Sequence, residues 1–307
     1  MRPFECSKMG VLERSGCEAS MARESVCLKI DFHIGCRIAN IVCPKGELEK
    51  ALRCLFAARA SGDSGFEPPI EVSRNDEGYS LLGYGGLSLE AALGVIDAYF
   101  DSAIRSATQD KLATLHSFGV VAPGGKGIAI LGTSAAGKTT LGLACALEGL
   151  GLMGDEFAFL DLGSGEYRQA FYPLCVRDPT WEVLGLEKPE ASQRILTPLG
   201  GSACLLPRDL IEKTSASSCL SAPLGYVVCP ERDSSTSGVF LGELSVAAWP
   251  VDVMPSVDAP MPRDRLFSEL VSLSARKGIR FLRLRYADAR SAAKAISELV
   301  GNCRNGS

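Results

Sequence analysis

A glycine-rich loop that ends in a lysine and a threonine is the feature of this sequence that could do chemistry most directly. Residues 132–139 match the pattern G-x-x-x-x-G-K-[ST]. In such a loop the backbone N–H groups surround a polyphosphate, the lysine reaches the outer phosphates, and the hydroxyl ligates Mg²⁺. The alternative is a chance glycine-rich turn. The pattern favours nucleotide binding by Gly132, Thr133, Ser134, Ala135, Ala136, Gly137, Lys138, Thr139 and Thr140.

The segments on either side place this loop at the start of a helix. Residues 128–131 form a short apolar run of strand length, and residues 138–148 have the periodicity of a helix with one apolar face. A helix N-terminus attracts anions because its first N–H groups have no partner within the helix. Lys138 is expected to be exposed on the loop, so its replacement should affect binding more than packing.

Two adjacent carboxylates follow one helix and one strand after the loop. Residues 150–154 are predicted to form a second strand, parallel to the first, with Asp155 and Glu156 at its end, beside the bound phosphates. One carboxylate could hold Mg²⁺ while the other accepts the proton of an attacking hydroxyl. Asp155 is the expected base. Glu156, which points the other way and reaches further, is the expected metal ligand together with Thr139. A solvated acidic turn is the alternative.

His116 and Arg177 are the other candidate site residues. His116 precedes a strand predicted over residues 117–121, and a short turn leads from that strand to the loop, so His116 should lie at the loop end of the sheet. A functional and a structural role are equally favoured for this histidine. Arg177 follows a predicted hairpin and could neutralise charge in a transition state. The alternative is a surface ion pair with Asp178 or Glu182.

Composition indicates an ordinary globular chain. Its 307 residues are 46% hydrophobic and 22% charged, with a net charge of −4, which permits a sizeable core and gives no reason to expect a nucleic-acid partner. The first 25 residues do not resemble a signal peptide, and no stretch approaches a membrane span. The twelve cysteines form no C-x-x-C pair. We therefore interpret them as small buried side chains in a reducing, cytoplasmic setting.

The periodicity divides the chain into three parts. Residues 1–25 are predicted to be a disordered tail, residues 26–110 an α+β lobe, and residues 111–307 the domain that carries the loop. In the middle part, strands over residues 26–32 and 37–42 precede a helix over residues 46–60. Further predicted elements are strands at 70–72, 79–82, 157–162, 166–171, 222–229 and 279–285, helices at 88–107, 264–274 and 288–300, and surface loops at 233–238 and 250–262.

Taken together, these motifs resemble the HPr kinase/phosphorylase-like kinases. The resemblance rests on His116 before a strand, the loop at residues 132–139, an acidic pair only one helix and one strand later, and a hairpin after it. It is closest to the HPr-kinase-related proteins that modify a peptide serine. Motif-level likeness spans residues 116–177. The chain departs from that family by having Glu156 where a second Asp is usual and Arg177 where a Lys is usual, and by lacking the glycine-rich signature loop.

This resemblance implies a kinase lobe like that of phosphoenolpyruvate carboxykinase, with a central mixed sheet, beside a smaller α+β lobe. It implies that residues 132–140 bind ATP, that Thr139 and Glu156 hold Mg²⁺, that Asp155 is the base, and that His116 lies beside the transferred phosphoryl group. The implied reaction is transfer to a serine-type hydroxyl of a peptide or protein. A kinase for a small molecule such as free serine, and a nucleotide-binding regulatory protein without catalysis, remain open, and so does a homo-oligomeric state.

Overall fold

The computed structural model describes residues 25–32, 36–55, 59–60, 70–89, 91–96, 98–99, 112–133, 135–169, 174–188, 202–205, 217, 219 and 221–302. The tail predicted over residues 1–25 therefore lies outside the described residues, apart from Ser25. So does the boundary predicted near residue 110. No helix in these described ranges is long and apolar enough to cross a membrane.

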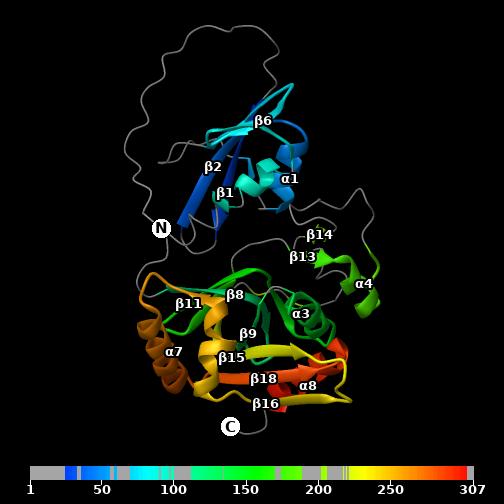
Figure 1. Cartoon of the computed structure of the whole chain (residues 1–307), viewed down its shortest axis with the longest axis vertical. Helices are drawn as coiled ribbons and strands as arrows, with labels where there is room; N and C mark the ends of the chain where they lie inside the picture. The colour runs from blue at the N-terminus through cyan, green and yellow to red at the C-terminus, as the bar shows by residue number, and fades with distance from the viewer. Residues whose placement is uncertain are drawn as a thin grey trace.

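The N-terminal lobe comprises the described residues between 25 and 99, drawn at one end of the molecule in Figure 1. Its strands and helix are β1 (Ser25–Phe32), β2 (Cys36–Pro44), α1 (Glu47–Leu55), β3 (Arg59–Ala60), β4 (Ile70–Glu71), β5 (Ser73–Asn75), β6 (Gly78–Leu81) and β7 (Tyr84–Leu87). One sheet has the order β3-β1-β2-β4, and a second has the order β5-β6-β7. Helical residues at 89, 91–96 and 98–99 follow.

The C-terminal lobe comprises the described residues between 112 and 302, and it carries the predicted loop. Its elements are β8 (Leu112–Val121), β9 (Gly127–Leu131), α3 (Lys138–Leu147), β10 (Gly151–Gly154), β11 (Phe157–Asp161), β12 (Glu166–Gln169), β13 (Leu174–Arg177), α4 (Asp178–Leu184), β14 (Ser202–Leu205), β15 (Ser221–Arg232), β16 (Val239–Glu243), η2 (Val246–Ala248), α6 (Trp249–Asp252), η3 (Met254–Ser256), β17 (Val257–Asp258), α7 (Arg263–Lys277), β18 (Arg280–Tyr286) and α8 (Ala289–Asn302).

The long strand β8 organises a nine-stranded mixed sheet. Its second half pairs with β9 on one side and β10 on the other, while its first half pairs with β17 and β11. β11 then pairs with β12, β12 with the start of β15, and β15 with β9. These pairings close a circuit of five strands, β8-β11-β12-β15-β9. Every side chain of β9 is buried as a result.

Helices cover both faces of this sheet. One core joins α3, α4 and α8 to one face, and a second core joins α6 and α7 to the other; Figure 1 shows α7 and α3 on different sides of the strands. A third core fills the N-terminal lobe and includes Phe159 of β11, so the two lobes share apolar packing there. The α/β class and the mixed central sheet expected from the sequence are confirmed.

Three of the predicted boundaries are wrong. Residue His116 lies within β8 and does not open it, because five residues before Ser117 pair with β11. The helix predicted over residues 46–60 ends at Leu55, since residues 59–60 pair with β1. Residues 250–262 form no free loop, because they hold most of α6, all of η3 and β17, and buried side chains such as Val257.

Candidate functional site

The loop at residues 132–139 connects the buried strand β9 to the first turn of α3, as predicted. Helix α3 starts with a backbone bond from the Leu141 N–H to the Gly137 carbonyl, 2.9 Å long. Gly137 has a φ of +85°, and a β-carbon there would lie 3.1 Å from the hydroxyl of Tyr286. The positive φ and this close approach both favour glycine at this position. Ser134 lies outside the described residues, and in the rest of the loop the Ala136 N–H donates to the Thr133 carbonyl at 3.2 Å.

Lys138 is buried, contrary to the expectation that it would be exposed. Only 6% of its surface is accessible, and its Nζ donates to the carbonyls of Gly132 (2.9 Å) and Thr133 (3.2 Å). Burial lowers the pKa of the ammonium group, and the charge of Asp155 opposes that shift. The lysine therefore belongs to the internal bonding of the loop.

Asp155 is the most deeply buried charged group of the site. Its side chain is 3% exposed, and it accepts a 2.7 Å bond from the Thr139 hydroxyl and a 2.9 Å bond from the Glu156 N–H. Burial raises the pKa of its carboxyl to about 6, and the neighbouring charge of Glu156 adds to the shift. The two hydrogen bonds and Lys138 act in the opposite direction.

Glu156 occupies a strained turn and faces His116. Its φ is +71°, and a 3.0 Å bond from the Phe157 N–H to the Asp155 carbonyl closes a three-residue turn around it. Its carboxylate, about half exposed, lies 3.1 Å from Nε2 of His116. The hydrogen bond from His116 is the main cause that lowers the pKa of Glu156. The turn thus sends the two neighbouring carboxylates to different partners.

Strand order explains how residues far apart in the sequence meet here. β9 and β10 are both antiparallel to β8, which lies between them, so they run in the same direction as predicted. The acidic pair directly follows the last residue of β10, as the sequence predicted. It lies at the junction of β10 and β11, where the Ser117 N–H of β8 donates to the Glu156 carbonyl. His116 of β8 pairs with Phe157 of β11, the residue that follows Glu156, and is therefore held beside the turn.

Arg177 lies at the end of β13, where it is the N-cap residue of α4. Its side chain is exposed, and α4 is tied to α3 by a 2.9 Å bond between the hydroxyls of Thr180 and Thr140. The charge of Arg177 contributes to the lowered pKa values of Lys138 and Glu156, so it acts on the same site. The expected alternative partner Asp178 pairs with Lys188 instead.

A divalent cation fits the oxygen atoms at Thr139 and Asp155. A hydroxyl and a carboxylate that already touch match the hard oxygen ligands of Mg²⁺, which usually takes only one or two carboxylates beside substrate phosphates. No group of three or more His, Cys, Asp or Glu side chains in the described ranges could hold a metal by itself. The structure thus pairs Thr139 with Asp155, whereas the sequence led us to pair it with Glu156.

Sequence reasoning missed three buried polar side chains beneath the acidic pair. Ser117, Tyr167 and Gln169 form a hydrogen-bonded chain that ends on the carbonyls around Glu156. The sequence of the hairpin contained a signal for them, because Tyr167 and Gln169 are two residues apart on one strand and therefore place their polar groups on the same face.

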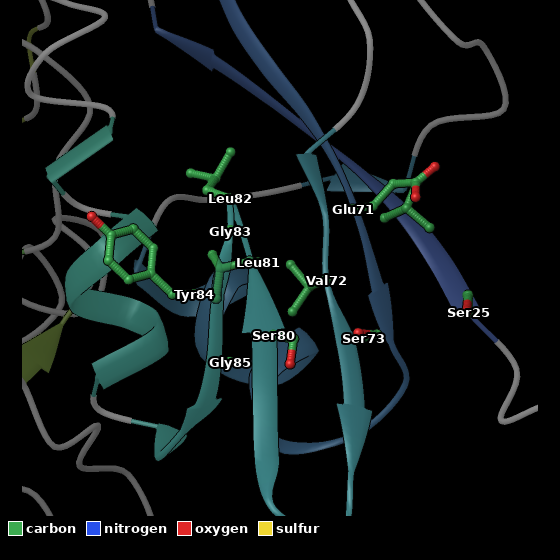
Figure 2. Close-up of a pocket in the computed structure, with 11 residues that line it drawn as sticks. Ser25, Glu71, Val72, Ser73, Ser80, Leu81, Leu82, Gly83, Tyr84 and Gly85 are labelled. Carbon is green, nitrogen blue, oxygen red and sulfur yellow. The ribbon is translucent and has the colours of Figure 1, made fainter. Parts of the chain in front are cut away.

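A surface groove of about 620 Å³ lies in the N-terminal lobe, away from this cluster. Figure 2 shows lining residues from the start of β1, from the β4–β5 segment, and from the hairpin of β6 and β7, where Leu82 and Tyr84 are exposed. None of the charged groups of the loop site lines this groove.

No protein-family model matches this chain, and no curated protein matches it. Its function must therefore be inferred from the chemistry of the residues that the fold brings together.

Proposed function

We propose that this chain is an ATP-dependent kinase that transfers the γ-phosphoryl group to a serine-type hydroxyl of a peptide or protein. The observation that carries the proposal is the 2.7 Å bond between Thr139, next to the loop lysine, and Asp155, at the junction of β10 and β11. A threonine hydroxyl and a buried carboxylate in contact beside such a loop are the two protein ligands that Mg²⁺ needs in a phosphoryl-transfer site.

The loop residues would bind the phosphates of ATP. The first N–H groups of α3 have no partner within the helix and would bind the anion, and Lys138 supplies a positive charge beside them. When bound at Thr139 and Asp155, Mg²⁺ supplies charge neutralisation and holds the phosphate oxygens in place. The buried Asp155 is suited to this pairing because a nearby cation stabilises its ionised form.

Glu156 and His116 suit the acceptor side. The Glu156 carboxylate is partly exposed and His116 holds it from one side, so it can contact an incoming hydroxyl; its lowered pKa keeps it ionised but makes it a weak base. Asp155 is less suited to be the base that the sequence suggested, because both of its oxygens already accept hydrogen bonds below the surface. In a loose transition state, positioning of the hydroxyl matters more than basicity.

The acceptor class is proposed from the resemblance to the HPr-kinase-related proteins. The charge of the exposed Arg177 contributes to the low pKa of Glu156, and the same charge would stabilise an anionic transition state beside it. A kinase for free serine or a similar small molecule would use the same residues. A regulatory protein that binds nucleotide without transfer would keep the loop but would not need the exposed Glu156–His116 pair.

Three measurements on the purified chain test this proposal. The first is ATP affinity with and without Mg²⁺. The second is transfer of labelled γ-phosphate to a serine-peptide library, to proteins and to free serine. The third repeats both measurements on Thr114→Val, which removes a buried hydroxyl on β8 outside the site and should behave like the wild-type chain. We expect Mg²⁺-dependent ATP binding and labelled peptide. Binding without transfer to any acceptor would favour the regulatory protein, and absence of ATP binding would overturn the proposal.

A further inference from the structure

A buried polar chain runs beneath the acidic pair. The hydroxyl of Ser117 lies 2.9 Å from that of Tyr167, and the Tyr167 hydroxyl donates to Oε1 of Gln169 at 3.2 Å. The Gln169 amide nitrogen then donates to the carbonyl of Asp155 (3.0 Å) and to that of Phe157 (2.7 Å). One side chain thus ties together the backbone on both sides of Glu156.

The strands around Gln169 leave room for it. A β-carbon on Gly154 would lie 2.4 Å from Cγ of Gln169, and one on Gly119 would lie 2.6 Å from its Oε1 and 2.8 Å from the Tyr167 hydroxyl. These two glycines come from neighbouring strands, β10 and β8. A buried amide is costly unless its hydrogen bonds are made, so this side chain is tolerated here because both of its N–H groups and its oxygen are satisfied.

The network also fixes which way the amide points. If the amide were reversed, Oε1 would face two carbonyl oxygens, which cannot donate a hydrogen. Tyr167 donates to the Oε1 side and so favours the observed orientation. Its own hydroxyl is in turn held by Ser117. The N–H groups of Gln169 therefore face the turn because the side chains of Tyr167 and Ser117 orient its amide.

The turn at Glu156 needs such a support. A φ of +71° is unfavourable for a residue with a β-carbon, and a turn closed between residues two apart is strained. Strained backbone persists where the surroundings over-determine it. Without the Gln169 bonds, the backbone preference of a residue with a β-carbon favours an extended path from β10 into β11. The side chains of Asp155 and Glu156 would then lose their separate directions.

We propose that Gln169 is a positioning residue: its two hydrogen bonds to the Asp155 and Phe157 carbonyls hold the turn that sends Asp155 to Thr139 and Glu156 to His116. This inference rests on the proposed function only for the purpose of the turn, which is to place Asp155 as metal ligand and Glu156 as base. The claim that Gln169 holds the turn is separate, and backbone measurements test it without any activity.

The test compares Gln169→Met with Thr114→Val. Methionine keeps an unbranched side chain of similar length but removes both donors. Thr114→Val also removes one buried bond, from the Thr114 hydroxyl to the Asp258 carbonyl, on the same sheet but away from the turn. Tyr167→Phe serves as a milder variant, since it keeps the ring and removes only the group that orients Gln169.

The first readout is hydrogen–deuterium exchange of the Phe157 amide, which closes the turn. We expect exchange to be faster by about tenfold or more in Gln169→Met, by less in Tyr167→Phe, and unchanged in Thr114→Val. Equal changes in Gln169→Met and Thr114→Val would reduce Gln169 to an ordinary structural residue. Unchanged exchange in Gln169→Met would overturn the proposal, and should that variant not fold, unchanged exchange in Tyr167→Phe would do so.

The second readout separates positioning from loop binding. We expect the Mg²⁺ concentration for half-maximal ATP binding and transfer to rise about tenfold or more in Gln169→Met. The reason is that residues behind a metal ligand fix the orientation of that ligand. Affinity for ATP without Mg²⁺ should change by less than about twofold, since the loop is on β9 and α3. If the wild-type chain bound no ATP, the proposed function would fail while the exchange result still decided the role of Gln169.

Discussion

The hydroxyl of Thr139 and the carboxylate of Asp155 are joined by a 2.7 Å hydrogen bond between the first turn of α3 and the junction of β10 and β11. This contact depends on β8, which lies between β9 and β10 and sets the spacing of the two segments. It makes Asp155 the partner of the loop and leaves Glu156 for His116. Neutralising each of the two neighbouring carboxylates is therefore expected to cause a different functional defect.

Asp155→Asn should raise the Mg²⁺ requirement, and Glu156→Gln should slow transfer. For Asp155→Asn we expect the Mg²⁺ concentration at half-maximal activity to rise about tenfold or more, because a ligand carboxylate is lost. For Glu156→Gln we expect Mg²⁺-ATP affinity to be retained while acceptor phosphorylation falls about 100-fold or more, the usual scale for a general base. Titration of Mg²⁺ against ATP binding and transfer separates the two.

The sequence had suggested the reverse assignment, with Asp155 as base and Glu156 on the metal. Exchanged phenotypes would restore that assignment and leave the kinase proposal intact. If both variants transferred phosphate normally, neither carboxylate would take part in catalysis, and the nucleotide-binding regulatory protein would become the better account.

Stability should fall with rising pH because of Asp155. Its folded pKa of about 6 lies above the ordinary value of 3.8, so between these values the folded chain binds a proton that the unfolded chain has lost. The favourable contribution is complete below pH 3.8 and is lost as the pH rises through 6. In the absence of Mg²⁺ and ATP, Asp155→Asn should therefore raise the free energy of unfolding near neutral pH by at most about 3 kcal/mol.

Denaturant unfolding of both proteins at about pH 4 and about pH 7.5 measures this effect. The stability difference between variant and wild type should be large at the higher pH and should shrink at the lower one. A destabilised Asp155→Asn at both values would mean that the bonds from Thr139 and the Glu156 N–H outweigh the burial of charge.

Lys138→Met should weaken ATP binding without unfolding the chain. The substitution removes a buried ammonium that bonds the carbonyls of Gly132 and Thr133, and methionine fills similar space. Loss of a charged hydrogen-bond donor to phosphate should reduce ATP affinity by about 10-fold to 100-fold. Calorimetry measures the ATP affinity of the variant, and a melting curve shows whether the variant is folded. Unchanged affinity in the folded variant would contradict nucleotide binding by this loop.

Arg177→Ala should slow transfer while leaving ATP affinity nearly unchanged. Asp178 is paired with Lys188, and within the described ranges Arg177 makes no ion pair, so its charge is free to act on the phosphates. We expect transfer to fall about tenfold or more. Arg265→Ala, an exposed position on α7, is the matched control and should leave transfer unchanged. Equal activity of the two variants would make Arg177 an ordinary surface residue.

Local patterns in the sequence predicted the elements around the loop well. The predicted strand at residues 128–131, helix at 138–148 and strand at 150–154 correspond to β9, α3 and β10, and Asp288 caps the helix after β18 by accepting from the Ser291 N–H. Segments held mainly by distant partners were missed. Examples are β17, a two-residue strand fixed by pairing with β8, and β13, fixed by β14.

The membership of the site was easier to predict than its geometry. His116, Asp155 and Glu156 do lie together, but the turn at Glu156 depends on Gln169, which a single sequence does not link to residue 156. An extended chain would send neighbouring side chains to opposite faces, and we assigned roles on that basis. A three-residue turn has a different geometry, so the partner of each carboxylate could only be read from the structure.

Helix α3 can carry Lys138 and Thr139 to this site only because Gly142 lets it approach β8. A β-carbon on Gly142 would lie 2.0 Å from the ring of Phe118, which is fully buried between helix and sheet. Alanine normally stabilises a helix interior by roughly 0.5–1 kcal/mol relative to glycine. Here the clash should reverse the sign, and Gly142→Ala should lower the free energy of unfolding by about 3 kcal/mol, at the upper end for overpacking.

Gly301→Ala on α8 is the matched control, because a β-carbon there meets nothing within 4 Å. It should be neutral or stabilising by a few tenths of a kcal/mol, roughly, near the end of its helix. Any Gly142→Ala protein that folds should also need more Mg²⁺, since a displaced α3 moves the Thr139 hydroxyl away from Asp155. Equal stability of the two alanine variants would show that Phe118 moves aside at little cost, and α3 would not be fixed against β8 by this contact.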